Sequence, residues 1–365
     1  MGESAVKAVL LVGGEGTRLR PLTCNTVKAM VPVLNRPFLE HIVRYLVSHG
    51  VDEIVVTVCY LPERIRDYFG DGRDFGVRMH YVQEKSPLGT AGAVRNAAAH
   101  LDGTFLVLNG DIFTGLDLAD MIAIHRANGA EATIALTPVD NPSAYGVVEI
   151  EDTHRVRRFI EKPPPGEVSS NLINAGTYVL EPSVLEGIPP DVPFMFEHHV
   201  FPGLLSRGAP FYAYVSDAYW LDIGTPEKYL KLNCDLLEGN CRSVSGISWL
   251  DESHSSCSIE RTAVIEGRVV MGESCVIGPD VILRGPMVLG NHCTVLEGAT
   301  LEQVVLWNNV SVGMKASLKR CVVGANTCVG NGCQIGEGCI VGDGLRLSEG
   351  LCLAPGERVW PEGAR

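Results

Sequence analysis

The sequence predicts a two-domain protein, an α/β domain followed by a left-handed parallel β-helix. Length is the first reason, because 365 residues exceed what one compact domain usually contains. The second reason is that short apolar runs alternate with helix-length segments from Lys7 to about Leu237. The third is a six-residue repeat near the C-terminus, which is typical of a β-helix with three repeats per coil. We therefore divide the chain into domains 1–237 and 262–365, joined by a linker at 238–261.

Composition narrows the classes of protein that fit. The chain is 46% hydrophobic and 20% charged, as soluble globular proteins are, and its net charge of −13 argues against a nucleic-acid partner. The apolar runs are too short to cross a membrane. The twelve cysteines include no C-x-x-C pair, so a zinc site is not expected. Without an export signal, such cysteines predict reduced thiols in the cytoplasm.

The α/β domain is predicted from buried strands and amphipathic helices. Three apolar runs of strand length lie at Ile54–Val58, Phe105–Leu108 and Ala132–Leu136. Apolar residues have helical spacing over Phe38–Ser48 and Leu118–Asn128. This alternation predicts a largely parallel sheet, which binds its ligands at the carboxyl ends of its strands.

The β-helix is predicted from apolar–glycine pairs that recur mostly in steps of six. The pairs are Met271-Gly272, Ile277-Gly278, Leu289-Gly290, Val323-Gly324, Val329-Gly330, Ile335-Gly336 and Val341-Gly342. The pattern slips between Leu296 and Ser317, where we expect a loop or an irregular coil.

The same repeat explains five of the cysteines, which each lie two residues before an inward aliphatic position. They are Cys275, Cys293, Cys321, Cys333 and Cys339. Because a buried free cysteine behaves as a small hydrophobe, we expect these side chains to fill the core.

The first candidate site is a glycine-rich loop that follows the apolar run Ala8–Val12 directly. It contains Gly13, Gly14 and Gly16, and Arg18 comes just after it. Glycines leave backbone N–H groups bare, so such a loop can bind phosphate oxygens, and arginine adds charge. The glycines could instead serve only packing. A dinucleotide-binding loop fits less well, because the G-x-G-x-x-G spacing is absent.

Two aspartates and two lysines are candidates for charge chemistry. Asp111 and Asp222 each follow an apolar run, and Mg²⁺ is commonly held by one or two carboxylates together with substrate phosphates. As an alternative, both could be turn residues before glycine. Lys28 and Lys162 could each bind a phosphate, although a solvated lysine is the ordinary interpretation.

Two further groups of polar residues could bind a sugar and a base. Glu161, Asn174 and the Tyr145-Gly146 pair supply hydroxyl-binding groups and a close-approach glycine. The loop from Gln83 to Gly92 contains glycines that would admit a flat ring.

Taken in order, these motifs resemble the sugar nucleotidyltransferases, the nucleoside-diphosphate-sugar pyrophosphorylases. The likeness is strongest to the members that transfer a guanylyl group to mannose 1-phosphate, and it covers nearly the whole chain. The segments that carry it are 11–22, 87–92, 109–111, 145–148, 159–163, 174–176 and 220–225, followed by the hexapeptide domain.

The resemblance implies a Rossmann-like nucleotidyltransferase fold, Mg²⁺ as cofactor, and an NTP and a sugar 1-phosphate as substrates. It implies nucleotide contacts from Leu11, Gly13, Gly14, Gly16, Thr17, Gln83, Gly89 and Thr90. Catalytic roles would fall to Arg18, Lys28, Asp111 and Lys162, metal binding to Asp111 and Asp222, and sugar binding to Gly146, Glu161 and Asn174.

Two positions depart from the family pattern. Members of the family usually have proline before the lysine that matches Lys28, and often after it, whereas Val27 and Ala29 stand here. Glu15 lies within the phosphate loop and must point away from a triphosphate to avoid repulsion.

The implied reaction is attack of a sugar 1-phosphate oxygen on the α-phosphorus of the NTP, with release of pyrophosphate. The nucleophile is already ionised, so positioning and charge compensation are what the protein must supply. Gly89-Thr-Ala-Gly92 favours GTP and mannose 1-phosphate, with glucose-1-phosphate thymidylyl or uridylyl transfer as the alternative.

Other classes of function remain open at this point. The chain could be a non-catalytic regulatory homologue that binds an NDP-sugar. The β-helix could be an acyltransferase, but only His292 falls clearly among the repeats, so an oligomerising role is favoured. We therefore expect a homo-oligomer assembled through the β-helix.

Overall fold

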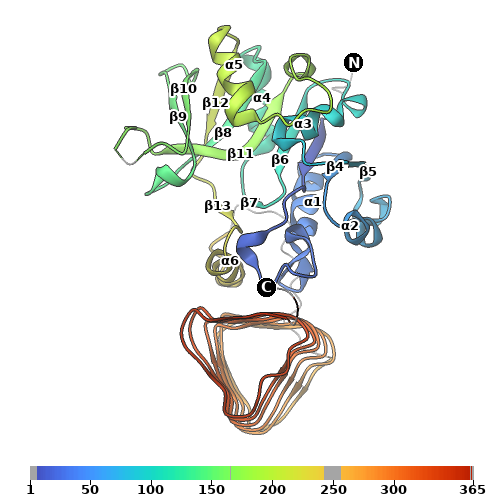
Figure 1. Cartoon of the computed structure of the whole chain (residues 1–365), viewed down its shortest axis with the longest axis vertical. Helices are drawn as coiled ribbons and strands as arrows, with labels where there is room; N and C mark the ends of the chain where they lie inside the picture. The colour runs from blue at the N-terminus through green and yellow to red at the C-terminus, as the bar shows by residue number, and fades with distance from the viewer. Residues whose placement is uncertain (1–5, 165, 242–255, 362, 364–365) are drawn as a thin grey trace. The chain divides into compact units, whose positions relative to one another are not determined.

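The computed structural model describes residues 6–164, 166–241, 256–361 and 363, and its contacts divide the chain into two compact units (Figure 1). The first unit contains the chain up to Gly14 together with Ile42–Trp220. The second contains Glu15–His41, the helix near residue 230 and the C-terminal β-helix. Much of the predicted linker, residues 242–255, lies outside the described residues.

One half of the nine-stranded sheet in the first unit is parallel. Its strands lie in the order β6-β1-β4-β5, and all three pairings are parallel. Their bounds are Lys7–Leu11 for β1, Glu53–Val58 for β4, Arg78–Gln83 for β5 and Phe105–Asn109 for β6. The buried strands predicted from apolar runs are confirmed here.

The other half of this sheet is mostly antiparallel, so the prediction of a largely parallel sheet is wrong. Strand β11 runs antiparallel to β6, β8 and β9, and β10 runs antiparallel to β9, whereas β12 is parallel to β8. The bounds are Ala132–Pro138 for β8, Gly146–Ile150 for β9, Val156–Glu161 for β10, Leu172–Leu180 for β11 and Phe211–Val215 for β12. Apolar runs report burial but not strand direction, which explains the error.

The predicted helices form where the apolar spacing placed them. The two predicted helices are α1 (Phe38–Ser48) and α4 (Leu118–Ala127). The sequence analysis did not predict the other helices of this unit, α2 (Pro62–Phe69), α3 (Gly89–Asn96) and α5 (Phe201–Ser206). Asp117 is the N-cap residue of helix α4, and its carboxylate accepts the Asp120 N–H at 3.0 Å. In the described part of the chain, no helix combines the length and apolar character needed to cross a bilayer.

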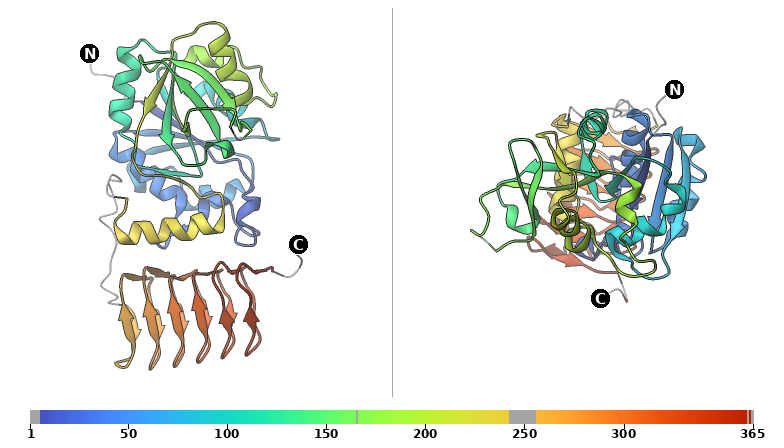
Figure 2. Two further views of the ribbon diagram at one scale, coloured as in Figure 1. Left: turned by 90° about the vertical axis from the view of Figure 1, so that its left-hand side faces the viewer. Right: turned by 90° about the horizontal axis from the view of Figure 1, so that it is seen from above.

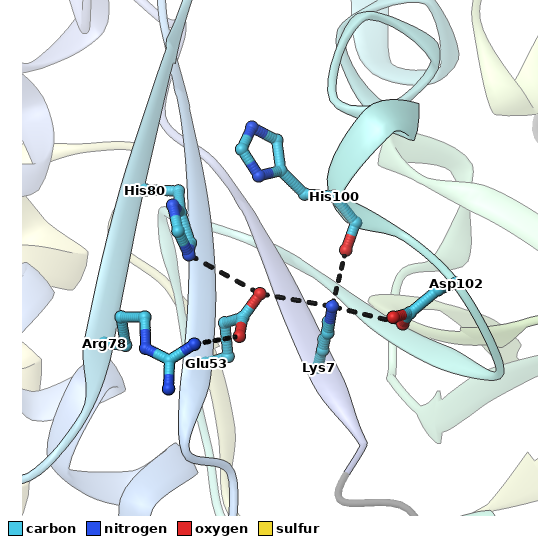
Figure 3. A network of polar contacts seen from close by, with 6 residues as sticks. All are labelled: Lys7, Glu53, Arg78, His80, His100 and Asp102. Atoms are coloured by element: carbon cyan, nitrogen blue, oxygen red, sulfur yellow. Dashed lines mark hydrogen bonds and ion pairs between the residues drawn. The ribbon is translucent and has the colours of Figure 1, made fainter.

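A polar network ties together the amino ends of β1, β4 and β5 (Figure 3). Lys7 Nζ lies 3.2 Å from Glu53 Oε1 and 3.1 Å from Asp102 Oδ1, and it donates to the His100 carbonyl at 2.9 Å. The other oxygen of Glu53 lies 3.1 Å from Arg78 Nη1. These contacts join the parallel strands at their amino ends. The site residues lie at the opposite edge, where these strands have their carboxyl ends.

The C-terminal strands form a parallel β-helix with three sheets, seen end-on in Figure 1 and from the side in Figure 2. The first sheet contains β14 (Ser258–Ile259), β17 (Val276–Ile277), β20 (Thr294–Val295), β23 (Ser311–Val312) and β26 (Cys328–Val329). The second contains β15 (Val264–Glu266), β18 (Ile282–Arg284), β21 (Thr300–Glu302), β24 (Ser317–Lys319), β27 (Gln334–Ile335) and β29 (Cys352–Leu353). The third contains β16 (Val269–Met271), β19 (Met287–Leu289), β22 (Val305–Leu306), β25 (Val322–Val323), β28 (Ile340–Val341) and β30 (Arg358–Val359).

The repeat slips because one corner of the β-helix is shortened, so the predicted loop or irregular coil between Leu296 and Ser317 is wrong. Arg284 pairs with Glu302, whereas Val288 pairs with Val305, so the later corner is one residue shorter than the earlier one. The strands on either side of that corner keep their pairing. The next coil has the same short corner, because Lys319 and Val322 pair with Glu302 and Val305. Two one-residue deletions therefore shift the hexapeptide pattern in the sequence without interrupting the coil.

The five cysteines assigned to the repeat are fully buried, as predicted. Each has a relative exposure of 0%, and they lie among the inward aliphatic residues of the β-helix core. The sequence interpretation of these cysteines as core residues is confirmed.

The third sheet of the β-helix also buries its outward face. Val270, Val288, Val305, Val322 and Ile340 point outward from successive coils, yet each is at most 5% exposed. Helix α6 (Pro226–Glu238) packs on this sheet at β19. Asn35, in the turn between the short strands β2 (Pro32–Val33) and β3 (Arg36–Pro37), donates from Nδ2 to the Leu289 carbonyl at 2.8 Å.

Helix α6 crosses successive coils of the β-helix. The Leu237 carbonyl accepts Arg268 Nη1 at 2.9 Å in the first coil, and Trp307 Nε1 donates to Tyr229 Oη at 3.0 Å two coils further on. Tyr229 in turn donates to the Pro32 carbonyl. The segment 15–41, α6 and the β-helix are therefore joined by buried hydrogen bonds as well as by apolar packing.

Candidate active site

Two strand ends meet where the glycine loop begins. The Gly110 N–H donates to the Leu11 carbonyl at 2.9 Å, next to the parallel pairing of Leu11 with Asn109. A Cβ on Gly110 would lie 2.7 Å from that carbonyl oxygen, so only glycine fits here. Gly13 and Asp111 therefore leave the sheet at the same edge, as the sequence predicted.

The loop predicted to bind the base contains a buried carboxylate. Glu84 follows β5, and its carboxylate accepts the Leu88 N–H at 2.9 Å. Burial raises the pKa of Glu84. A Cβ on Gly13 would lie 3.4 Å from Glu84 Oε1, so the two loops are close, whereas Gln83 is exposed to solvent.

Gly89 and Thr90 are held by internal contacts. Gly89 has a φ of +70°, and a Cβ there would lie 2.8 Å from the Phe194 carbonyl. The Thr90 hydroxyl donates to Glu197 Oε2 at 3.0 Å and accepts the Phe196 N–H at 3.0 Å. Thr90 thus shapes this loop through its own hydroxyl contacts, and burial raises the pKa of its partner Glu197.

The residues predicted to bind the sugar lie on adjacent strands. Gly146 pairs with Glu161 across β9 and β10, and a Cβ on Gly146 would lie 2.8 Å from Glu161 Oε2. Lys162 follows with a φ of +46°, and its N–H donates to the Tyr145 carbonyl at 3.0 Å. Its Nζ lies 3.3 Å from Glu161 Oε1, and 68% of the side chain is exposed. Lys162 therefore presents an accessible ammonium next to the carboxylate of Glu161.

Asn174 lies at an irregularity in β11. Its side-chain amide donates to Tyr178 Oη at 2.9 Å and accepts the Gly176 N–H at 2.9 Å. A Cβ on Gly176 would lie 2.6 Å from Asn109 Nδ2, so Asn109 packs closely against this turn. The buried Oδ1 of Asn109 has no hydrogen-bond partner among the described residues, which makes it a candidate ligand contact that the sequence interpretation missed.

In the second unit, the end of the glycine loop packs against Lys28. Gly16 has a φ of +63°, and a Cβ there would lie 2.9 Å from Lys28 Cβ. Lys28 is 8% exposed, and its neighbours Val27 and Ala29 are 1% and 3% exposed. Lys28 and both of its neighbours are thus buried, although the prolines that the family pattern usually has are absent.

Arg18 lies on a short 3₁₀ turn, Thr17–Leu19, whose Leu19 is buried while Thr17 and Arg18 are exposed. A Cβ on Gly224 would lie 2.9 Å from Arg18 Nη2, so the guanidinium rests on a glycine next to Asp222. Asp222 closes strand β13 (Trp220–Asp222); its Oδ1 accepts the Gly224 N–H at 2.9 Å.

Lys228 forms an ion pair with Asp222 Oδ2. The sequence interpretation missed this lysine, because it lies in the first turn of α6, just beyond the motif segment 220–225. Glu15 is 63% exposed, and its carboxylate lies 3.5 Å from Arg20 Nη2. That Glu15 points away from a bound triphosphate stays a prediction.

Comparison with known proteins decides the family. Residues 7–239 match the family model described as nucleotidyl transferase, and residues 253–353 match the LbH domain of EIF2B subunit epsilon. The chain belongs to the nucleotidyl transferase family. The predicted enzyme class and the left-handed β-helix are thereby confirmed.

Three relatives illustrate the range of this nucleotidyl transferase family. Mannose-1-phosphate guanylyltransferase of Mycobacterium tuberculosis is 38% identical, over 74% of this chain and 76% of its own length. UTP–glucose-1-phosphate uridylyltransferase of Synechocystis is 34% identical, over 89% and 88%. The structure of HddC from Yersinia pseudotuberculosis complexed with GMP-PN is 32% identical, with a TM-score of 0.55, over 62% of this chain and 98% of that one.

The donor set of this nucleotidyl transferase suits a metal ion that is shared with a substrate. Among the described residues, no three His, Cys, Asp or Glu side chains gather closely enough to hold a metal alone. Asp111 lies in the turn after β6, and Asp222 ends β13. Mg²⁺ commonly takes one or two carboxylates, with substrate phosphates completing its shell. Each carboxylate is therefore chemically suited to Mg²⁺ bound together with a nucleotide, and that the two share one ion stays a prediction.

His292, the histidine considered for acyl transfer, lies at a corner of the β-helix. His292 has a φ of +57°, and its N–H donates to the Glu273 carbonyl at 2.7 Å. Ser274, Asn309 and Asn326 have similar positive φ values at the matching corners of neighbouring coils. His292 is thus one of a column of corner residues.

Proposed function

We propose that this chain transfers a nucleotidyl group from an NTP, preferably GTP, to a sugar 1-phosphate, preferably mannose 1-phosphate, and releases pyrophosphate. The observation that carries the proposal is the hydrogen bond from Gly110 N–H to the Leu11 carbonyl. It brings the start of the phosphate loop and the Asp111 loop to one edge of the sheet, in a chain of the nucleotidyl transferase family.

The nucleotide phosphates would be bound by the glycine loop and by cations close to it in sequence. Backbone N–H groups from Gly13 to Thr17 would contact phosphate oxygens, and Arg18 and Lys28 would supply positive charge. Arg18 is exposed on its turn, whereas Lys28 is buried. The nucleoside would be contacted by Leu11, Gln83, Gly89 and Thr90. Thr90 would contribute by shaping its loop.

Asp111 and Asp222 would hold Mg²⁺ together with the phosphates. When bound, the ion would offset the charge of the triphosphate and of the leaving pyrophosphate. Lys228 already neutralises part of the Asp222 charge, so it would tune how strongly this carboxylate binds a cation.

The sugar 1-phosphate would lie next to Lys162. Its ammonium is accessible and belongs to a backbone held by the hydrogen bond to Tyr145. Glu161 would accept sugar hydroxyls, Gly146 would leave room for the ring, and Asn174 would contribute through the turn that it shapes with Gly176. The unpaired Oδ1 of Asn109 is a further acceptor for a hydroxyl.

This arrangement suits a reaction whose main difficulty is electrostatic. Two anions must approach each other, and the sugar phosphate needs no general base because it is ionised at neutral pH. Lysine and arginine side chains fixed before the substrates arrive lower the barrier, since they need no reorganisation during the reaction. Lys162 would position the nucleophile, while Arg18 and Lys28 would stabilise charge on the nucleotide.

Support for GTP and mannose 1-phosphate comes from the names of relatives, and one relative supports a different pair. The M. tuberculosis relative is named a mannose-1-phosphate guanylyltransferase, and the Yersinia structure contains GMP-PN. The Synechocystis relative is named a UTP–glucose-1-phosphate uridylyltransferase, so uridylyl transfer to glucose 1-phosphate is the second candidate.

A substrate panel tests the proposal. Each NTP is combined with mannose, glucose or N-acetylglucosamine 1-phosphate and Mg²⁺, and pyrophosphate release is measured. We expect kcat/KM for GTP with mannose 1-phosphate to exceed every other pair by about tenfold or more. Asp111→Asn should lower kcat by about 10²-fold or more, while Asp74→Asn, on an exposed turn, should match the wild type. Release from no pair would favour an NDP-sugar-binding regulator.

We also propose a cytoplasmic homo-oligomer assembled through the β-helix. The twelve cysteines are all free thiols, and the β-helix exposes the large apolar side chains of Val264, Val276, Leu296 and Met314. Sedimentation equilibrium should give a particle larger than the 39.3 kDa chain. A monomer at micromolar concentration would contradict the assembly.

A further inference from the structure

The last coil of the β-helix contacts the turn that carries Arg18. Arg358, at the start of β30, donates from Nη1 to the Arg20 carbonyl at 3.0 Å and to the Arg18 carbonyl at 3.4 Å. Both partners belong to the same compact unit as the β-helix. A side chain near the C-terminus therefore binds the backbone of this turn, although Arg358 and Arg20 lie 338 positions apart in the sequence.

These two carbonyls lie at the end of the 3₁₀ turn, where the turn itself offers them no further donor. Leu19, between them, is fully buried, and the Arg20 N–H closes the turn on the Thr17 carbonyl at 3.2 Å. A guanidinium binds two carbonyls at once, so it fixes the direction of the backbone as well as its place. The turn is thus held from inside by Leu19 and from its end by Arg358.

A second contact holds the residue that follows this turn. A Cβ on Gly342, in the third sheet, would lie 3.2 Å from Pro21 Cβ and 2.7 Å from Pro361 Cδ. Only glycine lets Pro21 pack this closely on the coil. Two neighbouring coils, at Gly342 and at Arg358, therefore support the chain from Arg18 to Pro21.

We propose that Arg358 is a positioning residue for nucleotide binding, which it affects by holding the backbone on which Arg18 is presented to the NTP phosphates. This inference rests on the proposed function, since it assigns a nucleotide contact to Arg18. It gives the β-helix a part in the affinity for NTP. The sugar-phosphate residues, Gly146, Glu161 and Lys162, belong to other strands, so their substrate should be affected less.

The test compares Arg358→Ala and Arg358→Lys in the full chain with a matched arginine variant. Arg346 is also exposed and lies near the C-terminal end of the β-helix, but its backbone bridges Cys328 of the first sheet. Arg346→Ala therefore removes the same side chain away from the loop. KM for GTP, KM for mannose 1-phosphate, kcat and Tm are measured, together with hydrogen exchange of residues 13–24 in the protein without substrates.

We expect Arg358→Ala to raise KM for GTP by about tenfold, the loss typical of a charged hydrogen bond that is partly exposed. KM for mannose 1-phosphate and Tm should change little, and exchange of residues 13–24 should become faster. Arg358→Lys should restore part of the affinity, because its ammonium can still donate to one carbonyl. Arg346→Ala should match the wild type in every measurement.

The inference is overturned by unchanged exchange and KM for GTP in Arg358→Ala, or by equal effects in Arg346→Ala. A parallel rise of both KM values with a lowered Tm would also overturn it, because that pattern indicates general destabilisation. If the wild type transfers no nucleotidyl group, the proposed function fails by itself. Hydrogen exchange then still decides whether Arg358 holds the loop.

Discussion

Lys162 combines a strained backbone with an exposed ammonium, and the two can be separated by substitution. Its φ of +46° lies in the left-handed region, which costs a residue with a Cβ about 1–2 kcal/mol. Pro163 follows and restricts the backbone further. Glycine removes this cost, but it loses about 0.5–1 kcal/mol more conformational entropy on folding than alanine does. The balance predicts that Lys162→Gly is more stable than Lys162→Ala by about 0.5–1 kcal/mol.

This order is the reverse of the usual one, in which alanine stabilises a protein relative to glycine. Arg157 on strand β10 provides the control, since it is exposed, does not have a positive φ and should show alanine as the more stable variant. In thermal unfolding, the two Lys162 variants should differ by about 1–4 °C, with glycine higher.

Both Lys162 variants should lose sugar-phosphate binding to the same extent. Removal of one charged contact to a phosphate predicts a rise in KM for mannose 1-phosphate of about 10–100-fold, with KM for GTP nearly unchanged. The reasoning is refuted if alanine is the more stable variant at position 162. It is equally refuted if either variant keeps the wild-type KM for the sugar phosphate.

Three further predictions concern other parts of the structure. Gly110→Ala should place a Cβ against the Leu11 carbonyl, destabilise the chain by about 1–3 kcal/mol in urea and reduce kcat, whereas a silent variant would contradict the tight contact. Burial lowers the pKa of His125, so the unfolded state takes up its proton first and the free energy of unfolding falls as pH drops below about 6.5. His125→Gln should reduce the fall in the free energy of unfolding between about pH 7 and 5.5. An unchanged slope would contradict the assignment of this fall to His125. Tyr229→Phe should leave the Trp307 N–H and the Pro32 carbonyl unpaired and cost about 2–4 kcal/mol, and a loss below about 0.5 kcal/mol would show that the link is weak.

The sequence predicted features that depend on local pattern. Apolar runs followed by glycine placed the phosphate loop and Asp111 at strand ends, and the hydrogen bond between Gly110 and Leu11 brings them to one edge. The hexapeptide pattern predicted the β-helix and its buried cysteines, such as Cys275. Each of these follows from the period of a regular element, which a single sequence displays directly.

Features that depend on contacts between distant residues were not predictable. Strand β11 is antiparallel to β6, a direction that its apolar residues do not encode. Thr90 meets Glu197 across 107 positions. Lys228 is only six residues from Asp222, but their ion pair depends on how α6 follows β13, which no motif in the sequence displays. The prediction of a loop or an irregular coil between Leu296 and Ser317 was wrong, because a shortened corner and a loop interrupt a sequence repeat in the same way.

Isotope transfer tests the central claim most directly. Mannose 1-phosphate carrying ¹⁸O in its phosphate is incubated with GTP, Mg²⁺ and the protein, and both products are analysed by mass spectrometry. Attack of the sugar phosphate on the α-phosphorus predicts that all of the label remains in GDP-mannose, while the pyrophosphate is unlabelled and forms in equal amount. Label in the pyrophosphate, or pyrophosphate without a labelled nucleotide sugar, would contradict nucleotidyl transfer at this site.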